Sequence, residues 1–61
     1  MTPAELRQLR IRKGISLLEL ADALHTSRPL LRMIETERMI LSPQQLQQYE
    51  AALLNYIASR R

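Results

Sequence analysis

Signals for the start of a helix are the feature that most limits how this sequence can fold. A Ser or Thr followed three residues later by Glu or Gln occurs at Thr2–Glu5, Ser16–Glu19 and Ser42–Gln45. In such a capping box the hydroxyl accepts a free backbone N–H of the first turn, and the Glu or Gln side chain reaches back to the capping residue. Proline follows at positions 3 and 43, where its fixed φ suits the first helical residue. We therefore expect helices to begin near residues 3, 17 and 43.

The helix ends and a further helix follow from glycine, proline and apolar spacing. Gly14, the only glycine, follows two cations and predicts that the first helix ends near residue 13. Apolar residues at helical spacing predict a helix from Leu17 to about His25 and another through Leu31 to residues 35–37. Pro29 lies in the first turn of this third helix, with residue 26, 27 or 28 as its N-cap. The last helix covers about 43–60, as one helix or two short ones.

These elements predict an all-α fold, a compact bundle of four to five helices in a single domain over residues 1–61. A chain of 61 residues buries only roughly 60% of its unfolded surface, so a partner subunit would add stability. Cysteine is absent and there is one histidine, so we expect no disulfide, no metal site and no cofactor. No apolar run is long enough to cross a membrane and the N-terminus has no signal-peptide pattern, which favours a cytoplasmic protein without membrane partners.

The charge pattern narrows the class of function. The net charge is +3, the surplus lies in residues 1–32, and eight of the nine basic residues are arginine, which suits bidentate contacts to phosphate and guanine. Charge alone is equally consistent with a solvated basic face. Catalysis is not expected, because His25 has no Ser, Cys or second His arranged around it and no glycine-rich phosphate loop occurs.

Residues 17–35 carry the most specific pattern, two short helices joined by a turn of three or four residues. Ala21 is small enough to let these helices cross closely, as in a helix-turn-helix. From Leu6 to about Leu53 the chain resembles the lambda-repressor-like, Cro-type (XRE) helix-turn-helix family. The matching segments are Leu6–Arg10, Lys13–Ser16, Glu19–Leu24, Ser27–Arg28, Ile34–Glu35 and Ser42–Pro43. The resemblance implies sequence-specific binding of double-stranded DNA with the third helix in the major groove, usually as a two-fold dimer on a palindromic operator.

The resemblance also assigns candidate site residues. The DNA-binding positions fall on Ser27, Arg28, Pro29, Arg32, Met33 and, in the following loop, Arg38. Ser27 is expected to cap the third helix and contact phosphate, while either Arg28 or Arg32 can fork onto a guanine. Pro29 and Met33 can offer only apolar contact, for example to a thymine methyl, and the alternative is that they start the helix and fill the core.

The resemblance also implies a pair of residues with a structural role. The paired charges of the family fall on Arg10 and Glu35. An ion pair between them would tie the first helix to the end of the third. Loss of one partner from such a buried pair is costly, so we expect these residues to act on the architecture before any contact with DNA.

Several positions depart from the family pattern. Leu17 replaces a phosphate-binding Gln, His25 replaces the glycine of the turn, and Thr36-Glu37 replaces Asn-Gly, so we expect the chain to leave the third helix differently. His25 is tolerable there because His adopts a left-handed backbone more readily than most residues. Apolar residues stand where the family tends to have cations. Exposed together, Leu17, Leu18, Met39, Ile40 and Leu41 would form a contact surface for a protein partner or a second copy. Alternatively, Ile40 and Leu41 fold inward onto Leu46 and Leu53.

The function we expect is a small DNA-binding transcriptional regulator, a repressor that acts by occupying its operator. The alternative is a protein-interaction module on the same fold, an antitoxin-like or anti-repressor partner with little or no DNA binding. The helix at 43–60 carries two neighbouring apolar stripes, which predicts a homodimer interface at Leu53, Leu54, Tyr56 and Ile57. In the alternative dimer, the Met39-Ile40-Leu41 loops of two copies contact each other.

Overall fold

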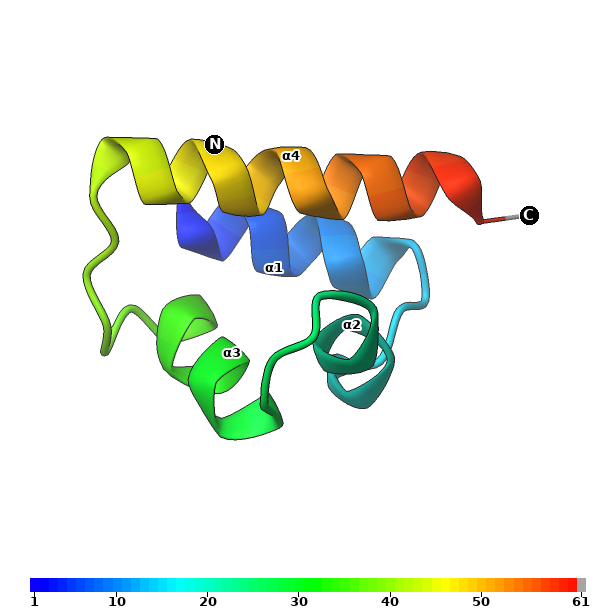
Figure 1. Cartoon of the computed structure of the whole chain (residues 1–61), viewed down its shortest axis with the longest axis horizontal. Coiled ribbons are helices and arrows are strands. Elements are labelled where there is room, and N and C mark those ends of the chain that lie inside the picture. The colour runs from blue at the N-terminus through cyan, green and yellow to red at the C-terminus, as the bar shows by residue number, and fades with distance from the viewer. Residues whose placement is uncertain (61) are drawn as a thin grey trace.

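The computed structural model describes residues 1–60, and this part of the chain contains four helices (Figure 1). They are α1 (Pro3–Arg12), α2 (Leu17–Ala23), α3 (Arg28–Glu35) and α4 (Pro43–Ser59). Helices α1 and α4 lie side by side and run in the same direction, and the shorter α2 and α3 pack across them on one side (Figure 1). The predicted all-α bundle is confirmed, and the C-terminal segment is one helix rather than two.

Two of the three predicted capping boxes are complete. The Thr2 hydroxyl accepts the Glu5 N–H at 3.2 Å, and the Thr2 N–H donates to the Glu5 carboxylate at 2.7 Å. Ser42 and Gln45 make the same reciprocal pair at the start of α4, at 3.2 and 3.0 Å. These local hydrogen bonds satisfy backbone donors that a helix N-terminus otherwise leaves unpaired.

The starts of α2 and α3 differ from the expectation. Ser16 caps α2 by accepting the Glu19 N–H at 3.0 Å, but the Glu19 side chain does not complete the box because it turns toward α4. At α3 the cap is Ser27, which accepts the Leu30 N–H at 3.3 Å. Arg28 is therefore the first helical residue, and its alternative role as the cap is wrong. Pro29 occupies the second helical position, where no intrahelical N–H is needed.

The Glu19 carboxylate holds the C-terminal end of α4 against α2 through Tyr56 of α4 and Arg60, the C-cap residue. The Tyr56 hydroxyl donates to Glu19 Oε2, and Arg60 Nε lies 3.2 Å from the same oxygen. Arg60 also donates to the Lys13 carbonyl at 2.9 Å, so the last turn of α4 contacts the end of α1 as well. The hydrogen bond to the Glu19 carboxylate raises the pKa of Tyr56. Sequence spacing alone does not reveal this three-residue link.

Helices α1, α2 and α3 end in the same hydrogen-bonded motif. After each helix a residue with positive φ follows the C-cap, namely Gly14 (70°), His25 (54°) and Glu37 (61°). At the end of α3, the Arg38 N–H donates to the Met33 carbonyl at 2.9 Å and the Glu37 N–H to the Ile34 carbonyl at 3.1 Å. This is the Schellman pattern, which normally uses glycine. The left-handed backbone expected for His25 is confirmed. Thr36-Glu37 was expected to change how the chain leaves α3, and Glu37 takes the positive φ that follows the C-cap despite its side chain.

Glu37→Gly is expected to raise the free energy of unfolding by about 0.5–1 kcal/mol, measured by urea denaturation. Glycine removes the steric penalty of a Cβ atom in the left-handed conformation, about 1–2 kcal/mol. Part of this gain is lost, because glycine gives up more backbone entropy on folding than other residues. The matched control is Thr36→Gly, because Thr36 has an ordinary φ of −91° and gains nothing from glycine. Equal losses of stability in both variants would contradict the claim of strain at Glu37.

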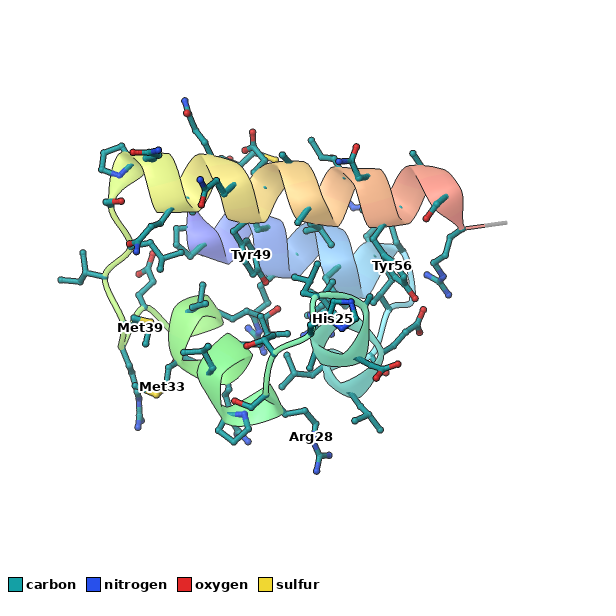
Figure 2. All side chains as sticks on the ribbon, in the orientation of Figure 1. His25, Arg28, Met33, Met39, Tyr49 and Tyr56 are labelled. Carbon is teal, nitrogen blue, oxygen red and sulfur yellow. The ribbon has the colours of Figure 1, made fainter. Side chains whose placement is uncertain are left out.

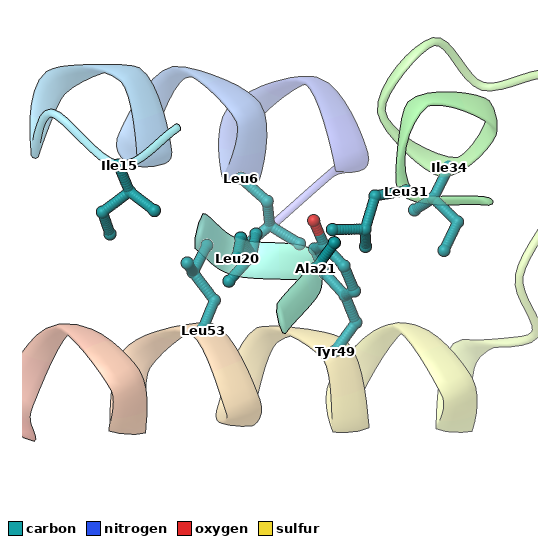
Figure 3. Close-up of a cluster of buried hydrophobic side chains, with 8 residues drawn as sticks. All are labelled: Leu6, Ile15, Leu20, Ala21, Leu31, Ile34, Tyr49 and Leu53. Carbon is teal, nitrogen blue, oxygen red and sulfur yellow. The ribbon is translucent and has the colours of Figure 1, made fainter. Parts of the chain in front are cut away.

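The hydrophobic core gathers one or more side chains from every helix (Figure 3). Its buried members are Leu6, Ile15, Leu20, Ala21, Leu31, Ile34, Tyr49 and Leu53. Ala21 is only 3% exposed at the crossing of α2 and α3, which agrees with the predicted role of a small residue there. The core residues of α4, Tyr49 and Leu53, belong to one of the two apolar stripes expected on this helix, the stripe of Leu46, Tyr49, Leu53 and Tyr56.

The Tyr49 hydroxyl is the polar exception within the core. It is buried and has no hydrogen-bond partner among residues 1–60. Burial raises the pKa of Tyr49 to about 12, and the nearby Glu35 carboxylate acts in the same direction. A hydroxyl left unpaired in a core costs free energy that a phenylalanine would not.

Tyr49→Phe is therefore expected to stabilise the fold by about 1 kcal/mol at neutral pH. The difference should grow above pH 10. The raised folded-state pKa means that the wild type loses stability as pH rises from the unfolded pKa of 10 through about 12, whereas phenylalanine does not titrate. Urea denaturation at pH 7 and at alkaline pH measures both effects. A Tyr49→Phe variant that is less stable than wild type at pH 7 would show that the hydroxyl is satisfied.

Candidate nucleic-acid interface

The outward face of α3 carries the residues that the resemblance assigned to DNA. Arg28, Pro29, Arg32 and Met33 are exposed, and they form two adjacent pairs four residues apart, which places them on one side of the helix. Leu31, Ile34 and Glu35, on the other side, are buried. Figure 2 shows Arg28 and Met33 at the side of the molecule that faces away from α4. Met33 is 41% exposed, so the alternative that it fills the core is wrong.

Two shallow depressions border this face and extend it beyond the helix. The first is lined by Leu17, Arg28, Pro29 and Arg32, and the second by Pro29, Arg32, Met33, Thr36 and Arg38. The loop residue Arg38 therefore belongs to the same surface as α3. We name the surface formed by Ser27, Arg28, Pro29, Arg32, Met33, Thr36 and Arg38 the α3 face. Its three arginines give it positive charge, and no acidic residue lines either depression.

Thr36 is the member of the α3 face that sequence reasoning missed. It follows Arg32 and Met33 by four and three residues, the spacing that places side chains on one side of a helix. Its hydroxyl donates to the Arg32 carbonyl at 2.7 Å, so it also helps to close the last turn of α3. The helical spacing from Arg28 onward is the signal that could have found it.

A buried ion pair fixes α3 to α1. Arg10 Nε donates to Glu35 Oε2 at 2.7 Å and Arg10 Nη2 to Glu35 Oε1 at 3.1 Å, a bidentate pair. Arg10 Nη1 also donates to the Ile15 carbonyl at 2.6 Å. The side chains of Arg10 and Glu35 are 10% and 4% exposed, which makes them architectural residues. The ion pair expected from the sequence is thus present. Arg7, not foreseen, lies 3.9 Å from the same carboxylate at the half-exposed rim.

The five apolar residues predicted as one contact surface lie in different places. Leu17 borders Arg28 beside α3, whereas Met39, Ile40 and Leu41 line a separate groove with Pro3, Glu37 and Leu46. Leu17, Met39 and Leu41 pack partly against the core, while Leu18 is 59% and Ile40 93% exposed. The prediction of a single five-residue surface is wrong. Of the two residues expected to fold inward in the alternative, Leu41 does and Ile40 does not.

The predicted dimer interface on α4 also needs correction. Leu53 is 0% exposed and belongs to the core, so it offers no surface to a second copy. Tyr56 is partly buried and bonded to Glu19, and Ile57 packs partly against the core. Leu54, at 45% exposed, is the member of the set that is largely open to solvent. Three of the four predicted interface residues, Leu53, Tyr56 and Ile57, are therefore wholly or partly used within the monomer.

The geometry of α2, the turn at His25 and the exposed α3 defines a helix-turn-helix protein. Comparison with known families agrees, because a family model described as helix-turn-helix matches residues 6–53, most of the chain. The chain belongs to this helix-turn-helix family, of the XRE or lambda-repressor-like type, whose members are DNA-binding regulators. No curated protein and no solved structure matches the chain.

No helix within residues 1–60 is both long and apolar enough to cross a membrane. Within the same range, no group of three or more His, Cys, Asp or Glu side chains is placed to hold a metal ion.

Proposed function

We propose that this chain is a sequence-specific DNA-binding transcriptional regulator that inserts α3 into the major groove. The observation that carries the proposal is the α3 face, where exposed arginines are held on a helix whose opposite side is locked into the core. An α-helix fits the major groove, where each base pair presents a distinct pattern of donors and acceptors. The family match supports DNA binding by this type of fold.

Six of the seven residues of the α3 face, all except Thr36, have a proposed role in DNA binding. Arg28 and Arg32 reach guanine O6 and N7, and Pro29 and Met33 make apolar contact with thymine methyl groups. Ser27 caps α3 and contacts a phosphate through its hydroxyl, beside the Arg28 N–H at the start of the helix. Arg38 pairs with a phosphate beside the groove and supplies affinity rather than specificity.

The proposal extends to mode of action. A homodimer on a palindromic operator would repeat these contacts in two half-sites about one DNA turn apart, roughly 34 Å. Occupation of an operator that overlaps a promoter blocks transcription without a further domain. We therefore propose a cytoplasmic repressor. Transcription in vitro from a promoter carrying the bound site tests this role, with a decrease expected, whereas an increase would identify an activator.

Selection from a pool of random-sequence DNA duplexes tests the DNA-binding proposal itself. The selected duplex should bind at least about 1,000-fold more tightly than a scrambled duplex of equal length and composition, as specific DNA-binding proteins do. The second candidate function, a protein-interaction module, is favoured by the exposed Leu18 and Ile40. Equal affinity for the selected and scrambled duplexes would favour that second function.

A further inference from the structure

Leu17 brings an apolar side chain from α2 to the surface that carries the arginines of α3. It is the first residue of α2, and it packs partly against the core. Together with Arg28, Pro29 and Arg32 it lines a shallow depression with a volume of about 470 Å³. This depression therefore combines two guanidinium groups with two apolar side chains.

The first turn of α3 leaves few hydrogen-bond donors free beside this depression. Pro29 has no N–H. The Leu30 N–H donates to the Ser27 hydroxyl at 3.3 Å, and the Leu31 N–H donates to the Ser27 carbonyl at 3.2 Å. A phosphate seated on Leu17 and Pro29 would lose bound water without gaining hydrogen bonds from their side chains. These two residues therefore favour an apolar group.

We propose that the depression binds the C5-methyl group of a pyrimidine base that lies close to a guanine held by Arg28 or Arg32. In the major groove thymine presents its C5-methyl group, whereas guanine presents two acceptors, O6 and N7. The apolar side chains of the depression match the methyl group, and its guanidinium groups match the acceptors. 5-Methylcytosine carries a methyl group at the same ring position, so the depression should bind it as well.

The spacing of the two arginines agrees with this arrangement. Arg28 and Arg32 lie four residues apart, and an α-helix rises about 6 Å over that distance. Successive bases of one DNA strand are about 3.4 Å apart. Guanines held by the two arginines would therefore lie within about two base steps of each other, with the pyrimidine beside or between them.

This inference rests on the proposed DNA-binding function and specifies which bases it reads. It adds Leu17, a residue of α2, to the residues that read bases. It also makes binding sensitive to methylation of cytosine.

Replacement of thymine by deoxyuridine removes the methyl group and keeps the base pair, so it tests the proposal. Each thymine of the duplex selected by the wild type is replaced in turn. At a thymine within two base steps of a guanine, we expect the wild type to bind about 3- to 10-fold more weakly, the effect of one buried methyl group. At the same position, 5-methylcytosine should be bound about 3- to 10-fold more tightly than cytosine. Fluorescence anisotropy at fixed salt measures both ratios.

Leu17→Ala tests whether the methyl group lies in this depression. We expect the variant to bind the thymine and deoxyuridine duplexes within about twofold of each other. Leu18→Ala is the matched control, because Leu18 follows in the same helix, is 59% exposed and lines neither depression of the α3 face. It should keep the ratio of the wild type. A smaller folded fraction of Leu17→Ala would affect both duplexes equally, so it cancels in the ratio.

The outcomes separate the methyl site from DNA binding. Failure of the wild type to select any duplex would refute DNA binding itself, and the methyl site with it. Equal binding of the wild type to all thymine and deoxyuridine duplexes, or a selected site without thymine near guanine, would refute the methyl site and leave DNA binding intact. A methyl effect that persists in Leu17→Ala, or that Leu18→Ala also loses, would overturn the assignment to Leu17.

Discussion

Arg10→Ala is expected to lower the free energy of unfolding by about 3–5 kcal/mol. The variant leaves the Glu35 carboxylate buried without its bidentate partner, and it also removes the donor to the Ile15 carbonyl. A domain this small has little stability to spare, so Arg10→Ala should be largely unfolded at 25 °C. Far-UV circular dichroism with urea denaturation measures the loss, in the presence of a stabilising osmolyte if needed.

A double-mutant cycle isolates the ion pair from other effects. Glu35→Ala alone should cost a similar amount, and the double variant should lose clearly less than the sum, because no unpaired charge remains buried. The matched control is Arg7→Ala, where the 3.9 Å approach and the half-exposed side chain predict a change below about 1 kcal/mol. Simple additivity of Arg10→Ala and Glu35→Ala would contradict the pairing.

Arg28→Ala is expected to weaken binding to the selected duplex by about 1–3 kcal/mol and binding to the scrambled duplex much less. The side chain is exposed at the first position of α3, on the side of the molecule away from α4. The variant loses a bidentate contact to guanine, and this loss affects only the selected duplex, which carries the guanine at that position. Arg32→Ala should behave similarly with a smaller loss. Fluorescence anisotropy with both duplexes at fixed salt measures the difference.

The control for Arg28→Ala must remove the same charge elsewhere. Arg12 is exposed in the last turn of α1, outside the α3 face, and Arg12→Ala makes that change. We expect it to leave the ratio of affinities for selected and scrambled DNA unchanged. If Arg28→Ala lowers both affinities equally, its side chain contacts phosphate rather than a base, and the proposed reading role of Arg28 is wrong.

Features encoded by short sequence distances were predictable. The caps at Thr2, Ser16 and Ser42 involve residues three positions apart, so their chemistry is visible in the sequence. The end of α1 is equally local, because the residue that needs a positive φ after its C-cap is Gly14, the one glycine in the sequence. The residues of the α3 face followed from the family resemblance together with helical spacing.

Most features that depend on tertiary contacts were not predictable, although the family resemblance implied the pair of Arg10 and Glu35. Ser16 and Glu19 have the spacing of a capping box, but Tyr56 and Arg60 offer the Glu19 carboxylate stronger partners from 37 and 41 positions away. Two apolar stripes on α4 look alike in sequence, and only packing against α1 and α2 shows that Leu53 lies in the core. The same holds for Ile40, because local pattern does not distinguish it from its inward-facing neighbours.

The salt dependence of binding to the selected duplex tests the central claim, that the α3 face binds DNA, most directly. Each subunit is proposed to engage three or four phosphates through Arg38, the start of α3 and neighbouring residues. Release of the corresponding counterions from a dimer site predicts a slope of about −5 to −7 in a plot of log affinity against log salt concentration. Arg38→Ala should reduce the steepness by about two, one phosphate for each subunit. A slope near zero, or one that Arg38→Ala leaves unchanged, would contradict the account.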